Sequence, residues 1–571
     1  MTAAANSPLR TRLQRFVAPL LLGLVCLLVY NANLRTIGSG DTLSARYLPL
    51  VLWHDGTLEL SAEARLVARG HPLDSTSQRP PDAAGKVAYL EPSAYWMMRT
   101  RSHALASYYP VVTPLLVAPL YLPAVAWLDA HGWEQPQVDR VAELMEKFAA
   151  SILAAVASVL MYLVLRRDAG RWAVPLTLAF AFGTNTWMIS SQALWQHGTA
   201  ELLVALALLL VHSPASRLRL ALLGAVCVVI VANRPPDAPI AVAFGLFVVL
   251  KSWRSAGWLV VGGIVPLLAL LSYNLGFIGL LIGGYSLVRA PDNFLQHDWQ
   301  GLAGLLVSPA RGLLVFSPFL IFVPLGLVRR LRFPGSRALA VALGCGVLAQ
   351  IVLYARFDWH GGECWGPRYM TDALPIFAWM IAPAASGLRA VGRGLLVLAM
   401  VASIGVQAIG AFWYTKTSDE VLYTEGSLRA LWNVRNIPFL VELRHPPAEP
   451  ELRCDAVGSI DRVGRDELPF ASAPPRLQPG ATIEGWALAC GRSPAQLALL
   501  IDGIIVGVPA DLRLRPDVEA ALHSDAPSGW RVSANLVGVP PGERVLQLAA
   551  RVGPRSDFRI VREQRVIVVA Q

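Results

Sequence analysis

Charged residues are scarce in this sequence. Only 15% of its 571 residues are Asp, Glu, Lys or Arg, while 54% are hydrophobic, and soluble domains carry about 25% charged residues. The composition excludes an ordinary soluble protein and indicates an integral membrane protein. The net charge of +10 would favour nucleic acid as the partner of a soluble protein. Here much of the excess is arginine in short loops between apolar runs, so we expect no nucleic-acid partner.

Cysteine is also scarce, and no two cysteines have the spacing of metal ligands. The six cysteines are scattered along the chain, which predicts no structural zinc site. Cys454 and Cys490 both fall in the final hydrophilic segment. They could form one disulfide if that segment is periplasmic.

The first apolar run lacks the small-residue cleavage site that follows a secretory signal peptide. Residues 16–32 are apolar enough to cross a bilayer, and Arg10, Arg12 and Arg15 flank the start of the run. Positive charge stays on the cytoplasmic side. We therefore expect a cytoplasmic N-terminus and a chain that emerges on the outer side.

The arginines decide how many further spans there are. Ten more apolar runs follow, and a proline-interrupted piece, Val111 to Leu128, could add another. If that piece does not cross the membrane, pairs such as Arg166-Arg167 and Arg329-Arg330 fall in cytoplasmic connections. If it does cross, every later loop changes sides, and the positive-inside rule fails. We predict an α-helical polytopic membrane protein with about 11 transmembrane helices, and place Val111–Leu128 along the outer surface as an interfacial or re-entrant element. The ten runs lie near 143–165, 172–189, 199–212, 218–232, 238–250, 256–276, 312–328, 338–355, 371–386 and 394–414.

This topology divides the chain into two domains. Residues 1–415 would form the membrane domain, with a large first outer loop at 33–142, and residues 416–571 a periplasmic linker and sheet domain. From about 440 to 571 the sequence alternates like strands and carries Pro-Gly punctuation, which predicts a C-terminal all-β sandwich. Trp486 or Trp530 could stack on sugar there; the alternative is a packed core tryptophan in a spacer domain.

An acidic residue lies close to the predicted outer boundary of the membrane. Asp41 is in a glycine-rich turn, Ile37 to Thr42, soon after the first span. A carboxylate that near the hydrocarbon is unfavourable unless it is paired or used. The simpler interpretation is a helix N-cap, for which Asp in such a turn is favoured. The two roles are compatible.

A few arginines depart from the cytoplasmic pattern and lie in the predicted outer loops. Guanidinium groups at an apolar–aqueous boundary suit phosphate oxygens, which they can bind with two hydrogen bonds. The alternative is that each pairs with a nearby carboxylate: Asp237 for Arg234, and Asp358 or Glu363 for Arg356 and Arg368. The four candidates are Arg234, Arg311, Arg356 and Arg368.

A second outer loop contains His197 and Glu201. They are four residues apart, so a helix would place both on one face. That arrangement allows a metal pair or a hydrogen-bonded acid–base couple. The alternative for His197 is simple capping at the interface. Glu201 lies at the start of an apolar run, where a charged side chain is unfavourable unless it is paired or has a function.

The layout of the chain resembles the GT-C glycosyltransferases, in particular the bacterial branch related to protein O-mannosyltransferases and lipid A aminoarabinose transferase. The resemblance covers about residues 10–415 and is mainly architectural. It rests on an N-terminal span, a first outer loop that opens with an acid, a proline-rich interfacial element and a C-terminal periplasmic domain. Its local anchors are Gly40-Asp41, Leu194–Gly198, Asn233–Pro235 and Trp359–Tyr369.

The resemblance implies a bacterial inner-membrane enzyme whose donor is a sugar on a polyprenyl phosphate. Asp41 would be the general base, and the four outer arginines would stabilise the leaving phosphate. It leaves a divalent metal open, because one His and one Glu make a poor site. The C-terminal domain looks like a bacterial immunoglobulin-like module, without catalytic implication. The further substrate-site candidates are Gln196, His197, Glu201, His360, Glu363 and Tyr369.

We therefore predict an inverting sugar transfer to an extracytoplasmic lipid, glycan or protein acceptor. One rival is a transporter or flippase of lipid-linked saccharides, which would show internal repeats and charges near mid-membrane. The sequence has no repeat, and its unusual charges gather at one predicted face. The other rival, a non-catalytic anchor for the C-terminal domain, would not need so long a first outer loop.

Overall fold

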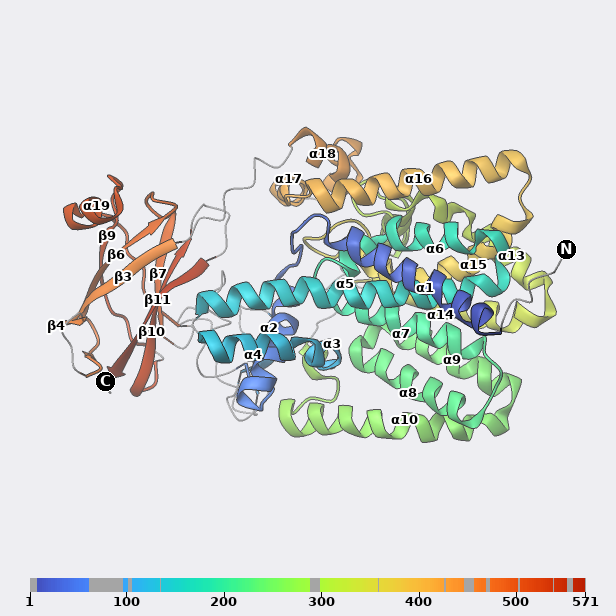
Figure 1. The fold of residues 1–571 in the computed structure, drawn as a ribbon, viewed down its shortest axis with the longest axis horizontal. Coiled ribbons are helices and arrows are strands. Elements are labelled where there is room, and N and C mark those ends of the chain that lie inside the picture. The colour runs from blue at the N-terminus through green and yellow to red at the C-terminus, as the bar shows by residue number, and fades with distance from the viewer. Residues whose placement is uncertain are drawn as a thin grey trace.

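The protein consists of a helical domain and a C-terminal β-domain, shown in Figure 1. In this computed structural model the long helices run along the long axis of the molecule, and the β-domain lies beyond one end of them. The N-terminus is at the opposite end. The structure describes residues 8–60, 96–100, 105–133, 135–287, 298–357, 359–425, 428–445, 456–468, 473–501, 504–537, 539–551 and 558–569.

The helices of the first domain identify a multi-pass membrane protein. Within the described residues, 5 helices are long and apolar enough to cross a membrane, and two shorter ones are apolar as well. The number of crossings stays a prediction. The five are Val112–His131, Gln137–Asp168, Trp253–Ile278, Pro334–Ala355 and Ala390–Trp413, and the shorter two are Val17–Asn31 and Gln196–Val211.

Each apolar run expected from the sequence is largely helical, but several are interrupted. The run at 312–328 is divided into a short helix, a 3₁₀ turn and a second helix, where Pro318 and Pro324 each lie near the start of a helical segment and lack the donor that the preceding turn would need. The α-helices up to residue 271 are α1 (Pro8–Asn31), α2 (Gly40–Asp55), α3 (Val112–Val117), α4 (Leu122–His131), α5 (Gln135–Asp168), α6 (Ala173–Phe182), α7 (Gln196–Val211), α8 (Arg217–Asn233), α9 (Ala238–Lys251) and α10 (Ala256–Leu271). The later ones are α11 (Asp298–Val307), α12 (Leu313–Phe316), α13 (Val323–Arg332), α14 (Pro334–Ala355), α15 (Leu374–Gly387), α16 (Ala390–Trp413), α17 (Thr417–Glu425), α18 (Pro438–Arg444) and α19 (Pro516–Leu522).

Short 3₁₀ and π segments join these helices. Several of them carry site residues, because a helix that ends or tightens near a boundary releases backbone groups and re-aims side chains. They are η1 (Ala118–Tyr121), η2 (Gly170–Trp172), η3 (Thr186–Ser190, a π-helix), η4 (Pro235–Asp237), η5 (Trp253–Ser255), η6 (Ser272–Ile278, a π-helix), η7 (Gly283–Leu287), η8 (Pro318–Phe322), η9 (Arg368–Ala373), η10 (Ala430–Trp432) and η11 (Val434–Asn436).

The proline-rich piece Val111–Leu128 is a helical run that changes type along its length. It forms α3, η1 and α4, which contact α2 and α5. In Figure 1 they lie at the end of the helical domain that faces the β-domain. By length and composition the same segment could cross a membrane, so its interfacial placement stays a prediction.

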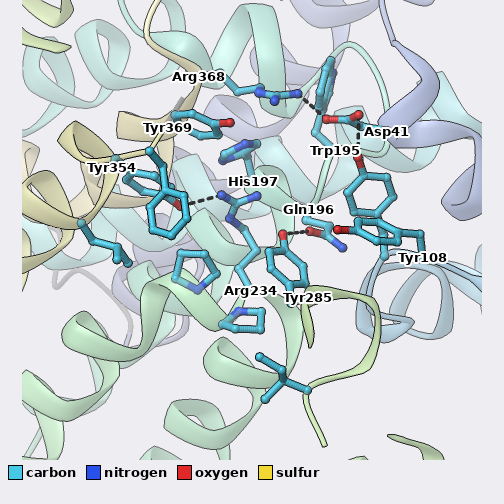
Figure 2. Close-up of a pocket in the computed structure, with 16 residues that line it drawn as sticks. Asp41, Tyr108, Trp195, Gln196, His197, Arg234, Tyr285, Tyr354, Arg368 and Tyr369 are labelled. Carbon is cyan, nitrogen blue, oxygen red and sulfur yellow. Dashed lines mark hydrogen bonds and ion pairs between the residues drawn. The ribbon is translucent and has the colours of Figure 1, made fainter. Parts of the chain in front are cut away.

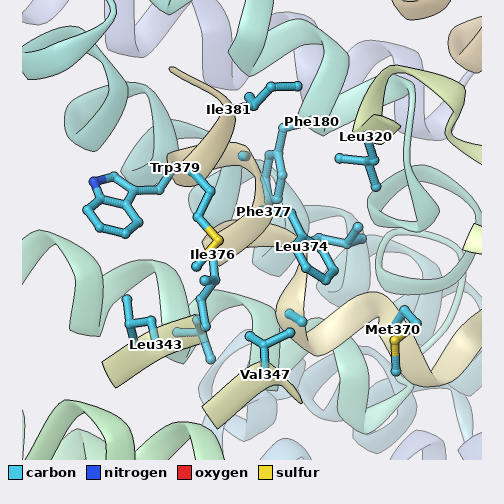
Figure 3. Close-up of a cluster of buried hydrophobic side chains, with 14 of the residues drawn as sticks. Phe180, Leu320, Leu343, Val347, Met370, Leu374, Ile376, Phe377, Trp379 and Ile381 are labelled. Carbon is cyan, nitrogen blue, oxygen red and sulfur yellow. The ribbon is translucent and has the colours of Figure 1, made fainter. Parts of the chain in front are cut away.

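Helix α15 is the centre of the helical domain. From Leu374 to Ala382 every residue is buried, as expected for a helix that is apolar all round. Its side chains pack against residues of α6, η8 and α14, including Phe180, Leu320 and Leu343 (Figure 3). Because η9 runs directly into α15, this packing fixes the position of the polar residues that precede it.

Helices α8 and α10 touch backbone to backbone. A Cβ built on Gly224 would lie 2.0 Å from the carbonyl oxygen of Leu259, and one on Gly262 would lie 1.8 Å from that of Ala221. Small residues at such contacts let membrane helices approach closely. The other faces of α10 are open, with Val265 74% exposed.

The C-terminal domain is a sandwich of two sheets, as predicted. The strand orders are β5-β11-β10-β7-β8 and β4-β3-β6-β9, and residues of both sheets form one apolar core. The runs expected as strands, 482–488, 496–508, 530–537, 544–552 and 560–569, recur with small shifts at their ends; β3, β4, β5 and the helix α19 were not foreseen. Two further strands, β1 (Met97–Arg99) and β2 (Leu105–Ser107), pair with each other between α2 and α3. The domain's strands are β3 (Ala456–Val463), β4 (Asp466–Glu467), β5 (Arg476–Leu477), β6 (Thr482–Ala489), β7 (Gln496–Ile501), β8 (Ile504–Gly507), β9 (Gly529–Ser533), β10 (Gly542–Arg551) and β11 (Phe558–Val568).

Two side-chain expectations for the β-domain can be compared with the structure. Trp530 is only 3% exposed and belongs to the sandwich core, so the packed-core alternative holds for it, while Trp486 is half-buried. Cys490 is disulfide-bonded. Its predicted partner, Cys454, lies outside the described residues.

Candidate functional site

Asp41 lies in the first turn of α2 and is not its cap. The N-cap is Ser39, whose hydroxyl accepts a hydrogen bond from the backbone N–H of Asp41 at 3.2 Å. The sequence-based expectation that Asp41 itself caps the helix is therefore wrong: Ser39, two residues earlier, satisfies a backbone donor of that turn. The carboxylate of Asp41 is left to make other contacts.

Helix α2 is held against α5 by two buried polar pairs. Arg46 forms an ion pair with Glu146, and the hydroxyl of Tyr47 donates to Asp139. The other oxygen of Glu146 accepts from the backbone N–H of Leu194 at 3.2 Å. One carboxylate thus links the helix of Asp41 to the loop that leads into α7.

The carboxylate of Asp41 pairs with an arginine that is far away in sequence. Its Oδ2 contacts Nη1 of Arg368, and its Oδ1 accepts from the hydroxyl of Tyr109 at 2.7 Å. The guanidinium of Arg368 also lies over the rings of Trp195, at 4.8 Å from the centroid, and Tyr369, at 5.3 Å. Burial lowers the pKa of Arg368, but the Asp41 carboxylate, together with smaller contributions from neighbours such as Tyr369, raises it by more, so the pKa is raised overall.

The loop before Arg368 has a conformation that only glycine adopts easily. Gly366 has a φ of +62°, and a Cβ there would lie 2.7 Å from the ring of Phe316. Arg311 holds the same loop in place through its backbone carbonyl oxygens. It donates to the carbonyl oxygens of Cys364 at 2.6 Å and Gly362 at 3.0 Å, and forms an ion pair with Asp419 at 2.6 Å.

A second charged cluster surrounds Asp372. Its Oδ1 is 2.7 Å from Nδ1 of His197, and its Oδ2 accepts from Nε of Arg234 at 3.0 Å. Arg234 also donates to the hydroxyl of Tyr354 at 2.6 Å. The ring of Tyr354 stacks on Tyr369 with a centroid distance of 4.5 Å. Since a carboxylate only accepts, His197 carries its proton on Nδ1 and turns Nε2 away from Asp372.

Asp237, the partner expected for Arg234, is the more distant of the two carboxylates. The separation is 3.8 Å, against 3.0 Å for Asp372. Burial raises the pKa of Asp237 well above its usual range, and the charge of Asp372 adds to that effect. Its Oδ1 accepts from the amide of Gln350. We expect Asp237 to be the protonated member of the pair.

Both clusters face one cavity of about 540 Å³. Figure 2 shows His197 between Arg368 and Arg234, with Asp41 on one side and Tyr354 on the other. Tyr285 donates to the amide oxygen of Gln196 at 3.2 Å, and burial raises the pKa of Tyr285 to about 12, which keeps the phenol neutral. The lining residues are Asp41, Tyr108, Tyr109, Trp195, Gln196, His197, Arg234, Pro235, Pro236, Ile282, Tyr285, Leu353, Tyr354, Phe357, Arg368 and Tyr369.

A second, apolar cavity of about 470 Å³ adjoins the first. Its walls come mainly from α3, α8 and α10 with η6, through aliphatic side chains such as Leu116, Val229 and Leu270. Tyr108, Tyr109, Pro235 and Ile282 line both cavities. A polar chamber and an apolar groove therefore meet at one wall.

The structure brings some of the sequence candidates together and separates others. Asp41, Gln196, His197, Arg234, Arg368 and Tyr369 all line the polar cavity. Arg311 and Arg356, expected at the phosphate, are outside that lining; Arg311 is occupied behind the loop. His360 is half-buried against Trp359, and Glu363 is exposed.

Glu201 does not form the expected couple with His197. It lies one turn further along α7, fully buried, and accepts from the hydroxyl of Thr186. His197 pairs with Asp372 instead. Within the described residues no group of three His, Cys, Asp or Glu side chains could hold a metal ion.

The sequence did not single out Asp372, Tyr109 or Tyr354. Asp372 had a detectable signal, since it is an acid at the entry to an apolar run, the same feature that singled out Glu201. The tyrosines had none, because an aromatic residue next to an apolar run is common at any membrane boundary.

Comparison with known proteins gives few matches. No protein-family model matches the chain, and no curated protein sequence matches it. Among solved structures, it is similar to the crystal structure of ArnT from Cupriavidus metallidurans bound to undecaprenyl phosphate. The TM-score is 0.40 at 15% sequence identity, and the match covers 75% of this chain and 74% of that one.

Proposed function

We propose that this protein is a membrane glycosyltransferase that moves a sugar from a polyprenyl-phosphate donor to an extracytoplasmic lipid, glycan or protein acceptor. The observation that carries the proposal is the meeting of the polar and apolar cavities. A lipid-linked sugar has the same two parts, a long apolar chain and a polar head joined through phosphate. Such a substrate needs both surfaces side by side.

The apolar groove suits the prenyl chain. Its lining is dominated by aliphatic side chains of α3, α8 and α10, and Asn274 is one of its few polar residues. Transfer of apolar surface into such a groove is favourable without directional contacts. The shared residues, Tyr108 and Tyr109 among them, would lie where chain and phosphate join.

The polar cavity suits the sugar and its phosphate. Arg368 and Arg234 present guanidinium groups to the cavity, and planar guanidinium groups bind phosphate oxygens well. The rings of Trp195 and Tyr369 line the same cavity and hold the guanidinium of Arg368 against them. Arg311 and Arg356, outside the lining, are left out of the phosphate site.

In the proposed reaction Asp41 is the general base. It takes the proton from an acceptor hydroxyl while the hydroxyl oxygen attacks the anomeric carbon. The bond from that carbon to the phosphate oxygen breaks, and its electron pair leaves on the polyprenyl phosphate. Arg368 and Arg234 stabilise the charge that develops there. A single displacement inverts the anomeric configuration.

The orientation follows from the arginines. With the arginine-rich connections in the cytoplasm of a bacterial inner membrane, the cavity and the β-domain lie on the outer side. The donor would present its sugar to an acceptor in the periplasm.

A complementation experiment tests the function. A deletion strain carrying wild type, Asp41→Asn or Asp41→Ala is compared by mass spectrometry of its glycolipids and surface polysaccharide. We expect loss of one sugar modification in both variants and full restoration by Asp55→Asn, a matched control at the exposed end of α2. Full rescue by both Asp41 variants at normal expression contradicts the assignment. Accumulation of a lipid-linked saccharide on the cytoplasmic leaflet would favour a flippase instead.

A further inference from the structure

The cavity contains two pairs of an arginine and a carboxylate, and they differ in access. In the pair of Arg234 and Asp372, the aspartate side chain is 0% exposed and lies behind the cavity wall. In the pair of Arg368 and Asp41, the aspartate is 19% exposed and lines the cavity. An incoming anion can reach the second pair and not the carboxylate of the first.

Arg234 is fixed by several contacts. Its Nε donates to Asp372 and its Nη2 to Tyr354, and Asp372 is itself held by His197. Taking Asp372 away from Arg234 would leave a buried carboxylate without its cation, which is strongly unfavourable. This arginine therefore keeps its carboxylate partner whatever enters the cavity.

Arg368 is held in place without depending on Asp41. The rings of Trp195 and Tyr369 lie against its guanidinium, and such contacts persist when an anionic partner is exchanged. Its side chain is 11% exposed and lines the cavity. The group can thus accept a new anion while it stays where it is.

Asp41 is engaged on both oxygens, by Tyr109 and by Arg368. A cation beside a carboxylate stabilises the charged form and makes the carboxylate a weaker base. In this arrangement Asp41 is poorly suited to remove a proton. Asp41 becomes a better base once Arg368 forms its ion pair with another anion.

We propose that the phosphate of the lipid-linked donor takes the place of Asp41 on Arg368, so that Asp41 becomes available as a base only when the donor is bound. This rests on the proposed function. Asp41 then acts as a built-in competitor for the phosphate site, and the donor binds before the acceptor is activated. Arg234 and Asp372 form the fixed wall against which the exchange takes place.

The exchange makes an unusual prediction for binding. Removal of the competing carboxylate in Asp41→Asn should tighten the binding of phosphate, although the same variant loses sugar transfer. We expect polyprenyl monophosphate in detergent micelles to bind Asp41→Asn at least tenfold more tightly than wild type. Arg368→Gln should lose most of the binding. Inorganic phosphate is the second probe: tightening with both probes identifies the phosphate as the exchanged group, and tightening with the lipid alone shows that the prenyl chain is needed to deliver it.

Tyr109→Phe gives an independent measurement. It removes the hydrogen bond that holds Oδ1 of Asp41 and keeps the carboxylate, so binding of polyprenyl monophosphate should tighten by a smaller factor, about twofold to threefold. Equal or weaker binding by Asp41→Asn, with a melting temperature like that of wild type, overturns the exchange. If that variant does not fold, unchanged or weaker binding by Tyr109→Phe overturns it.

The exchange and the proposed function can fail separately. If wild type transfers sugar but Asp41→Asn does not bind the lipid more tightly, the exchange alone is wrong. If Asp41→Asn binds more tightly and no strain shows a missing sugar, the glycosyltransferase proposal is wrong and the phosphate site remains.

Discussion

Arg234 faces two buried aspartates but can compensate only one negative charge. Asp372 is the closer partner, and its other oxygen holds His197. Asp237 is further from the guanidinium, and burial raises its pKa. Asp372 must therefore be charged to balance Arg234, whereas Asp237 is more stable in its neutral, protonated form.

We expect Asp237→Asn to be tolerated and Asp372→Asn to be harmful. The first replaces a protonated carboxyl by an amide of similar shape, so the free energy of unfolding should change by about 1 kcal/mol or less. The second leaves Arg234 without its nearest anion and should lower the free energy of unfolding by about 3 kcal/mol, near the low end for a broken buried pair. Thermal unfolding of both variants in detergent measures the difference.

The same pair predicts a dependence on pH. The folded protein holds the proton of Asp237 more tightly than the unfolded chain does, so wild type loses stability as the pH rises through the raised pKa of this group. Asp237→Asn has no titrating proton at this position, so its stability should fall less over the same pH range. Parallel pH curves for the two proteins would contradict the assignment of the proton to Asp237.

At the scale of elements, the loop before η9 depends on Arg311. Its guanidinium binds two loop carbonyl oxygens and Asp419, and it is only 3% exposed. The loop carries Arg368 into the cavity. Arg311, expected at the phosphate, thus acts on the site through the loop.

We expect Arg311→Met to loosen the loop and lower activity. Breaking the buried pair should reduce the free energy of unfolding by about 3–5 kcal/mol, and hydrogen exchange of residues 361–366 should speed up. The double variant Arg311→Met with Asp419→Leu removes the uncompensated charge and should regain part of the thermal stability. Loop exchange should stay fast in it. Recovery of both properties would show that the arginine matters only through its charge.

The elements themselves were largely predictable from the sequence. Apolar runs became helices because a span must satisfy its backbone internally, and strand alternation marked most of β6 to β11. The breaks at η8 and the extra helix α11 were not foreseen, since tertiary packing decides where a marginal helix ends. Pairings such as Asp41 with Arg368 join distant segments, and a single sequence carries no signal for them.

At the scale of the molecule, some of the groups predicted to share one face meet in a cavity and others do not. Asp41, His197, Arg234 and Arg368 line one cavity, which agrees with the relative sides given by the arginine count. That count placed these loops together, but it could not say which of the four arginines would enter the site. That depended on local turns such as the one at Gly366.

That the shared face is the periplasmic one is a testable prediction. Alkaline phosphatase fused to the C-terminus should be active, and green fluorescent protein fused there by the Sec route should be dark. Under oxidising conditions Cys490 should resist a maleimide that labels it after reduction, as expected for a disulfide-bonded residue. A fluorescent C-terminal fusion would reverse the topology.

The apolar cavity beside α8 and α10 has a consequence for kinetics. Leu115 and Leu116, two of its lining residues, are 43% and 46% exposed, and α10 is covered mainly by α8, so the groove is close to the surrounding lipid. If the donor arrives through the lipid, the reaction rate depends on the surface density of the donor and not on its concentration in the buffer. At a fixed amount of donor, the initial rate should fall as inert detergent is added and should recover when the mole fraction of donor is restored. For the proposed reaction, the membrane is the solvent in which the donor is dissolved.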